Sequence, residues 1–305
     1  GGDGFPGEPA LRHLRHPSFA VRATAASFAS QYTFGAEPVP EREARYLDAL
    51  RSENDPEMLA SLVRHAGDGI KRNPAIRNLV LRSLGHFDPR VRREALAALG
   101  RPDVAPDVPD ALLYIAPATK ADRPLEERLS ACAALGNVDD ARVVAWLGAL
   151  LADDSLPLEL HGACFAGLVG TWMRFPSPKV PSRAGYELTL RLLRAKPRPR
   201  AMAHPRGLRA LGSAGGPVSF LPKDAQSFYD AREVSEALAA LALDDDAFAP
   251  ARTEAGRSLV RLGQAPIIDA TIGALRKGGS PSGLAVATEM EKVRSGEGDP
   301  FGGRR

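Results

Sequence analysis

The stretch DPRVRREALAALG, residues 88–100, contains the start, the apolar face and the end of one helix. Asp88 can cap the helix and Pro89 suits its first turn, while Gly100 is a residue that commonly follows a last turn. Between these signals, apolar residues recur at the spacing of one helix face: Val91, Ala95, Leu96 and Leu99. We therefore predict an amphipathic helix in which Leu99 is buried.

Similar stretches recur along the chain with a period in the thirties. When they are aligned on Ala95, the matching positions are Ala25, Leu62, Ala131, Ala163 and Ala255. From Ala25 to Ala163 the successive separations are 37, 33, 36 and 32 residues. Second helices that complete the pairs are predicted at 42–51, 75–84, 108–115, 140–151 and 183–194, and the pattern resumes at 225–243, 248–262, 267–276 and 283–293. Such a period is typical of stacked helical pairs, so the predicted fold is an all-α superhelix, a solenoid of about seven or eight pairs.

The segment 88–100 closely resembles the first helix of a HEAT repeat, as also found in the bacterial phycobilisome-lyase-like subgroup. The resemblance extends over nearly the whole chain, and its motif specifies a fold only. An arginine recurs at one position of the repeat, as Arg22, Arg92, Arg128 and Arg252. In HEAT-like families such an arginine commonly bonds an acidic residue of a neighbouring repeat. The resemblance therefore implies a stacking ladder, that is, a series of arginine–acid pairs between successive repeats, and we call these four residues the ladder arginines.

Changes in composition divide the chain into a leader, a repeat region and a tail. Residues 1–15 begin with GGDGFPG, which indicates a flexible leader, and residues 295–305, SGEGDPFGGRR, indicate a flexible tail. We predict one HEAT-like solenoid over 16–294. Within it, prolines and glycines gather at about 174–222, which predicts an irregular insertion around the short helix 183–194.

The insertion carries a run of basic residues without an intervening acid: Arg191, Arg194, Lys196, Arg198, Arg200, His204, Arg206 and Arg209. Loops that extend from a rigid solenoid commonly carry binding function. We therefore predict that the arginines and the lysine of this run project into solvent and bind an acidic protein, a phosphate-rich polymer or an anionic lipid surface. A tolerated insertion whose charges are merely solvated is the alternative.

The overall charge of the chain gives little direction. Forty basic residues face 37 acidic ones, and a formal charge of +3 spread over 305 residues is no nucleic-acid signature by itself. No run of eighteen apolar residues is present, so no transmembrane helix is predicted. The Gly-rich start without a methionine fits a truncated cytoplasmic protein, and equally a periplasmic lipoprotein whose signal peptide was removed.

The sequence contains none of the common catalytic templates, such as HExxH, a Walker phosphate loop, GxSxG or CxxC. His13 and His16 have the spacing of two metal ligands but no third ligand beside them. Cys132 and Cys164 follow the reference alanines of consecutive repeats. Because neighbouring helices pack about 8–10 Å apart, we predict both to be reduced core residues. We predict no catalytic residue, no metal site and no cofactor.

These observations favour a non-enzymatic scaffold of HEAT repeats that binds another protein. One alternative is a nucleic-acid-binding protein resembling the HEAT-like alkylpurine DNA glycosylases. The modest charge and the missing constellation of aromatic and carboxylate side chains count against it. A bilin lyase or related phycobilisome factor is suggested only by the repeat subtype.

Overall fold

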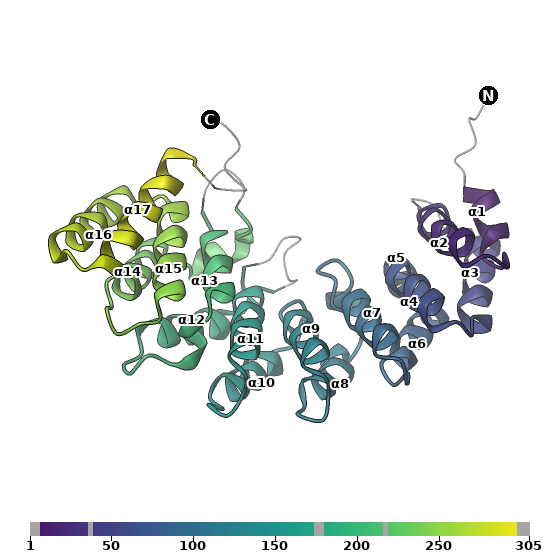
Figure 1. The fold of residues 1–305 in the computed structure, drawn as a ribbon. Coiled ribbons are helices and arrows are strands. Elements are labelled where there is room, and N and C mark those ends of the chain that lie inside the picture. The colour runs from purple at the N-terminus through teal and green to yellow at the C-terminus, as the bar shows by residue number, and fades with distance from the viewer. Residues whose placement is uncertain (1–6, 36–38, 174–179, 216–218, 298–305) are drawn as a thin grey trace. The chain divides into compact units, whose positions relative to one another are not determined.

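The computed structural model describes residues 7–35, 39–173, 180–215 and 219–297. Every regular element in these ranges is helical (Figure 1). The α-helices are α1 (Gly7–His13), α2 (Phe19–Thr33), α3 (Pro40–Ser52), α4 (Pro56–His65), α5 (Gly67–Arg72), α6 (Pro74–Ser83), α7 (Pro89–Leu99), α8 (Ala111–Ile115), α9 (Leu125–Leu135), α10 (Arg142–Leu151), α11 (Leu158–Gly170), α12 (Arg183–Arg194), α13 (Pro205–Gly212), α14 (Ala231–Ala242), α15 (Ala249–Leu262), α16 (Ala265–Gly278) and α17 (Pro281–Ser295). Short 3₁₀ segments are η1 (Ala105–Asp107), η2 (Ala116–Thr119), η3 (Arg200–Ala203) and η4 (Lys223–Ser227). The predicted all-α fold is confirmed.

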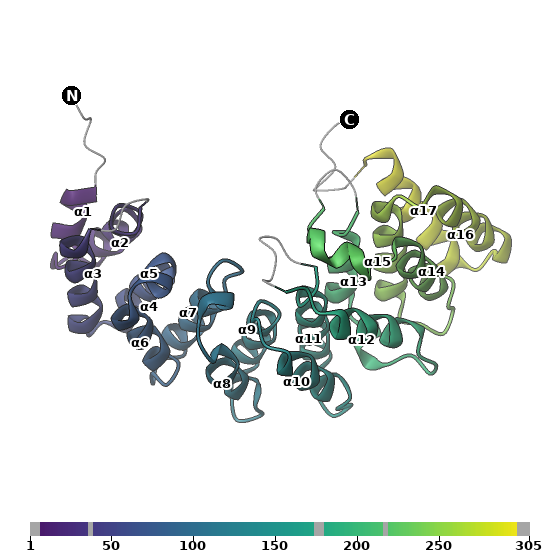
Figure 2. The same ribbon diagram turned by 180° about the vertical axis from the view of Figure 1, so that it is seen from behind.

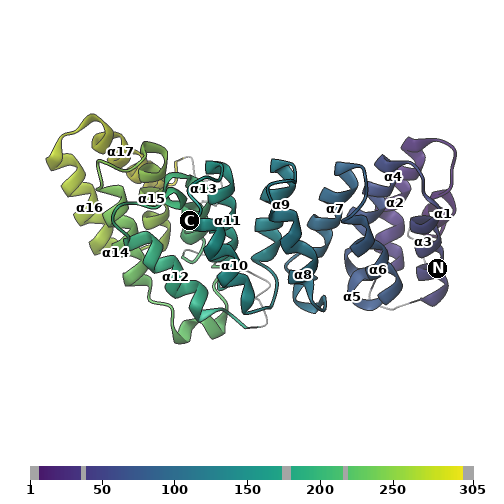
Figure 3. The same cartoon turned by 90° about the horizontal axis from the view of Figure 1, so that it is seen from below.

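By its internal contacts the chain divides into two compact units, Gly1–Ala134 and Leu135–Arg305, and each is described by itself. In the first unit, α2, α4 and α7 pack side by side as a first layer, and α3 and α6 form a second layer against them (Figures 1 and 2). In the second unit, α11, α13, α15 and α17 form the first layer, and α10, α12, α14 and α16 form the second. Figure 3 shows these two layers as two rows of helices.

The helices begin where the sequence supplies caps. Asp88 Oδ1 accepts a hydrogen bond from the backbone N–H of Arg90 at 2.8 Å, and Asp55 Oδ1 accepts one from Glu57 at 2.9 Å. Proline occupies the first turn of both helices. As a result α7 has the bounds that the sequence predicts, and Leu99 is fully buried as expected.

Helical structure starts earlier than predicted. Residues 7–13, which we assigned to a flexible leader, form α1 and pack against α2. Ala10, Leu11 and Leu14 are buried there. Burial of these three apolar side chains favours order in a segment whose first residues read as flexible.

A first-layer helix lies inside the segment predicted to be irregular. α13 packs between α11 and α15. This helix can form after a proline because Pro205 occupies its first turn, where a missing N–H costs nothing. Gly207 allows the close approach, since a Cβ at this position would lie 2.1 Å from Cδ1 of Phe165. The prediction that proline and glycine keep this segment out of the regular stacking is therefore wrong for residues 205–212.

The helix predicted at 225–243 begins later, with α14. Ahead of it, Phe228 and Tyr229 join the rings of Trp172 and Tyr186, with centroid separations of 5.1 Å for Trp172–Tyr186 and 5.5 Å for Tyr186–Phe228. Tyr229 stacks on Trp172 at 5.9 Å. Packing of these aromatic rings stabilises the chain more than an earlier start of α14 would. It also holds the residues after η4 against α12.

The prediction for the two cysteines is wrong. Cys132 and Cys164, both among the described residues, are disulfide-bonded. The separation of helix axes overstates the distance that matters, because a disulfide depends on the distance between Cα atoms. Since each Cα lies about 2.3 Å from its axis, axes about 10 Å apart allow facing Cα atoms to come within about 5–6 Å, which is ordinary disulfide spacing.

Candidate interaction surfaces

The predicted basic run is distributed over both layers of the second unit. Arg191 and Arg194 lie on α12 in the second layer, and Arg194 Nη2 contacts Glu233 Oε1 at 3.3 Å. Arg200 lies at the start of η3 and donates to the backbone carbonyl of Asp154. Arg191 is exposed. The run therefore offers no single continuous surface.

Lys196 and Arg198 brace the structure instead of projecting freely. Both donate to the carboxylate of Asp244, and the distance from Arg198 Nε to Asp244 Oδ2 is 2.7 Å. Hydrogen bonds from Lys196 and then Arg198 lower the pKa of Asp244 to about 2. Arg198 also donates to the carbonyl of Leu193 at 2.5 Å. The prediction that these side chains project into solvent is wrong for Arg198, which is 13% exposed and pairs with Asp244 in the turn after α14.

Arg206 and Arg209 lie on α13, in the first layer, and both are exposed. Arg209 Nε contacts Glu254 Oε1 on α15 at 3.3 Å. Two further arginines of α15 reach the same carboxylate: Arg261 Nη1 at 3.1 Å and Arg257 Nη1 at 3.6 Å. Three guanidinium groups therefore meet around one buried acid.

A second acid extends this group to α17. Arg257 Nη2 donates to Glu289 Oε2 at 2.6 Å, and Lys292 Nζ donates to Glu289 Oε1 at 2.8 Å. The hydrogen bonds from Lys292 and Arg257 lower the pKa of Glu289. We call Arg209, Glu254, Arg257, Arg261 and Glu289 the Glu254 cluster.

Sequence reasoning missed the Glu254 cluster, although a signal was present. Glu254 and Glu94 each precede the reference alanine of their repeats. In the first unit Glu94 is also buried, and it accepts two hydrogen bonds from Arg64 of α4, at 2.7 and 2.8 Å. A recurring glutamate at this position therefore indicates a carboxylate that joins adjacent first-layer helices.

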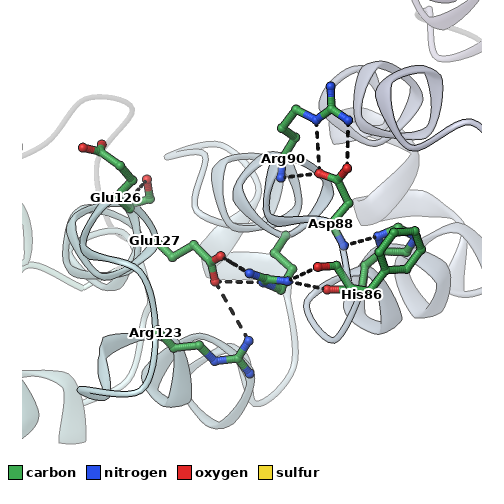
Figure 4. Close-up of polar contacts among 9 residues, drawn as sticks. His86, Asp88, Arg90, Arg123, Glu126 and Glu127 are labelled. Carbon is green, nitrogen blue, oxygen red and sulfur yellow. Dashed lines mark hydrogen bonds and ion pairs between the residues drawn. The ribbon is translucent and has the colours of Figure 1, made fainter.

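The arginine ladder is seen most clearly at Arg92. Its Nη1 donates to the carbonyl oxygens of His86 and Phe87 at 2.7 and 2.8 Å, and its Nε donates to Glu127 at 2.9 Å. Figure 4 shows Glu127 directed at this guanidinium and joined by a dashed line to Arg123. Arg123 Nη1 lies 3.9 Å from Glu127 Oε2. One side chain therefore holds its own turn and the next first-layer helix, as the resemblance implies.

Arg22, on α2, repeats this arrangement two first-layer helices before α7. Its Nη1 donates to the carbonyls of His16 and Pro17 at 2.9 and 3.0 Å. Its guanidinium lies 3.3 Å from Glu53 and 3.6 Å from Asp55, the cap of α4. The predicted ladder to an acid of the neighbouring repeat is thus confirmed at both Arg22 and Arg92.

The remaining ladder arginines hold their turns through different groups. Arg128 is buried and donates to the carbonyl of Thr119 at 3.0 Å. Arg252 is also buried, donates to the carbonyl of Ala242 at 3.1 Å and contacts Asp245 of the same turn at 2.8 Å. The ladder arginines are therefore structural, since their donors are directed at turn carbonyls and at acids of this chain.

Ion pairs also bring the starts of the first-layer helices of the first unit to one edge. The pairs are Arg22 with Asp55, Arg90 with Glu57, and Arg92 with Glu127. They connect α2 to α4, α4 to α7 and α7 to α9. Because all six residues lie in or beside the first two turns, the N-terminal ends of these helices lie side by side.

Large apolar side chains remain exposed along this edge. Phe87 is 80% exposed, and Phe19 and Leu125 are exposed at the starts of α2 and α9. Each lies three to five residues before a ladder arginine. We call Phe19, Phe87 and Leu125 the apolar edge. In the second unit Phe248 holds the same relation to Arg252 and is also exposed.

The described residues hold no group of three or more His, Cys, Asp and Glu side chains placed to bind a metal ion. The rings of His13 and His16 lie edge to face, with centroids 5.8 Å apart. None of the helices in the described ranges has both the length and the apolar character needed to cross a bilayer.

Comparison with known proteins identifies the fold and no closer relationship. No protein-family model matches the sequence, and comparison with curated proteins gives no match either. Among solved structures, the chain is similar to the karyopherin Kap121p in its complex with Pho4p, with 14% identity, a TM-score of 0.52, and coverage of 94% of this chain and 33% of Kap121p. Kap95p, studied with RanGDP, gives 16% identity, a TM-score of 0.51, and coverage of 95% of this chain and 40% of Kap95p. This chain therefore spans well under half the length of either protein, and the likeness shows that it is an all-α solenoid of HEAT-type helical repeats.

Proposed function

We propose that this chain is a non-enzymatic scaffold that binds a protein partner along the apolar edge of the first unit. The observation that carries the proposal is the exposure of Phe87, whose side chain is 80% exposed on a turn that Arg92 fixes with two hydrogen bonds. Aromatic side chains are enriched in protein interfaces. A rigid turn lowers the entropy cost of binding, because little remains to be ordered.

The setting of Phe87 fits a role as an anchor. Its ring lies 4.4 Å from that of His86, and His86 Nδ1 accepts the backbone N–H of Asp88 at 3.1 Å. The turn at His16 has the same hydrogen bond, from Ser18 N to His16 Nδ1 at 3.1 Å. The turns before α2 and α7 therefore have the same construction, with Phe87 on the second and Phe19 directly after the first.

Two further observations favour a protein partner over nucleic acid. The solved structures similar in fold hold or bind proteins, since Kap121p was solved with Pho4p and Kap95p acts on RanGDP. With 40 basic and 37 acidic residues, the chain has no large overall excess of positive charge to attract a phosphate backbone. The phycobilisome-lyase-like subtype and a bacterial lipoprotein remain predictions.

Affinity capture on the full chain tests this function. Phe87→Ser is compared with Leu113→Ser, a matched control: Leu113 is also exposed but belongs to α8, which is not one of the first-layer helices that form the apolar edge. Loss of one buried phenylalanine contact costs about 2 kcal/mol, or about thirtyfold in affinity. We expect a partner protein whose recovery falls with Phe87→Ser and not with Leu113→Ser. If no protein depends on Phe87, the proposal fails, and recovery abolished by nuclease treatment would favour a nucleic-acid partner.

A further inference from the structure

The first layer of the second unit carries a surface on which exposed basic side chains lie around the buried acid Glu254. Glu254 has only 3% of its side chain exposed, whereas Arg209, which contacts it, is 59% exposed. Arg206 and Lys292 are exposed as well, and Arg257 and Glu289 are half-buried. A molecule that approaches α13 and α15 therefore meets the guanidinium of Arg209 before it meets the carboxylate of Glu254.

The charges of this face do not cancel. The Glu254 cluster, together with Arg206 and Lys292, contains five basic side chains and two acids. The net positive charge of this patch equals the formal charge of +3 of the entire chain. Elsewhere in the unit, Lys196 and Arg198 share one acid, Asp244.

We propose that this face binds an acidic peptide segment of a protein partner. Arginine donors fit carboxylates in a planar, bidentate manner, and clusters of arginine are a recurring means of binding acidic motifs. The guanidinium groups are already held by Glu254 and Glu289, which lowers the cost of ordering them on binding.

The two acids within this patch argue against a nucleic acid as the occupant. Duplex DNA carries a charge about every 1.7 Å, and its affinity comes from many simultaneous phosphate contacts. The patch holds only five basic side chains, of which Arg261 is 15% exposed, and Glu254 and Glu289 pair with several of them. A short peptide with a few separated carboxylates matches this arrangement better than a dense polyanion.

The stacking of the helices also sets the spacing of the ligand. Neighbouring helices lie about 8–10 Å apart, and a peptide in the polyproline II conformation advances about 3.1 Å per residue with three residues per turn, so every third side chain lies on the same face. Acidic side chains three residues apart would therefore meet the basic groups of successive first-layer helices α13, α15 and α17. A peptide with glutamate at every third position should bind more tightly than one with the same glutamates in a single block.

Fluorescence anisotropy with the full chain tests the proposal. The probes are a labelled (Glu-Ser-Gly)₄ peptide, its Gln counterpart, a peptide with the four glutamates in one block, and an oligothymidine of equal charge. The variant is Arg206→Gln with Arg209→Gln. The control is Arg183→Gln with Arg232→Gln, two exposed second-layer arginines that each pair with an acid four residues later. The single variant Arg206→Gln removes a charge but leaves Arg209 paired with Glu254. It keeps the proposal testable if the double variant loses stability.

We expect the spaced glutamate peptide to bind and the Gln peptide not to bind. The Arg206/Arg209 variant should raise the Kd at least about tenfold and Arg206→Gln about threefold, while the control pair stays within about twofold. Salt raised from about 50 to about 300 mM should weaken binding. Equal losses in the variant and control pairs, no binding of the glutamate peptide, or tighter binding of the oligothymidine through the same arginines would overturn the proposal. The apolar edge is tested separately, because Phe87→Ser should leave peptide binding unchanged.

Discussion

Replacing Arg92 by methionine removes the hydrogen bonds and the ion pair of one ladder arginine while keeping a long, unbranched side chain. The substitution deletes two hydrogen bonds to the turn at His86 and Phe87 and the pairing with Glu127. Glu127 has 3% of its side chain exposed, and the remaining base, Arg123, lies 3.9 Å away. The variant therefore leaves a buried carboxylate with most of its compensation gone.

The size of the effect follows from that uncompensated charge. Breaking a buried pair by removing one partner typically costs about 3–5 kcal/mol, whereas replacing both partners by apolar groups costs much less. The two turn carbonyls add little, because water can reach this exposed turn. We therefore expect Arg92→Met to lower the free energy of unfolding by about 3–5 kcal/mol and the double variant with Glu127→Leu to regain about half of that loss.

Urea unfolding followed by far-ultraviolet circular dichroism measures these differences. Trp146 and Trp172 both lie in residues 135–305, so their fluorescence would report on the other unit. Arg93→Met is the control, since Arg93 is exposed and comes no closer than 4.0 Å to Glu94. This substitution should lower the free energy of unfolding by less than about 0.5 kcal/mol. The reasoning is refuted if Arg92→Met costs no more than Arg93→Met, or if the double variant is no more stable than the single one.

Three further outcomes are expected. Leu99→Ala should destabilise by about 2–5 kcal/mol in the same urea assay because Leu99 is fully buried, and a cost near zero would contradict the assigned face. Gly207→Ala should destabilise by about 1–3 kcal/mol through the clash with Phe165, whereas Gly273→Ala, with nothing within 4 Å of the added Cβ, should stabilise by about 0.5–1 kcal/mol; equal signs would show that α13 is not packed this closely. Burial lowers the pKa of His161, so the unfolded state binds its proton first and stability should fall as pH drops below about 6.5; melting temperatures at several pH values should show a shallower fall in His161→Gln, and identical slopes would remove this histidine from the account.

Much of the fold was predictable because its signals are local. Asp88, Pro89 and Gly100 delimit α7 as the sequence predicts, and the bounds of α12 agree with the predicted 183–194. The ladder could be predicted from the resemblance, since a regular stack gives a recurring arginine a recurring partner. These features depend on residues within one or two turns, or on the period of the repeat.

The candidate surfaces were less predictable because they depend on residues distant in sequence. Residues 191–209 contain no acid, so the basic run looks unpaired in the sequence. The acids that pair with its members follow some forty residues later, at Glu233, Asp244 and Glu254. Whether such charges meet depends on which helices stack, and a linear pattern does not contain that information.

By itself, the sequence determined the class of fold, its period, the caps of its helices and the ladder arginines, because each of these follows from helix geometry acting over a few residues or over one repeat. Only the tertiary structure decided that residues 205–212 form a first-layer helix, that Phe87 stays exposed, and that three arginines meet at Glu254. The physical reason is that exposure and ion pairing are properties of the packed layers, where close approach at a residue such as Gly207 sets which side chains are buried together.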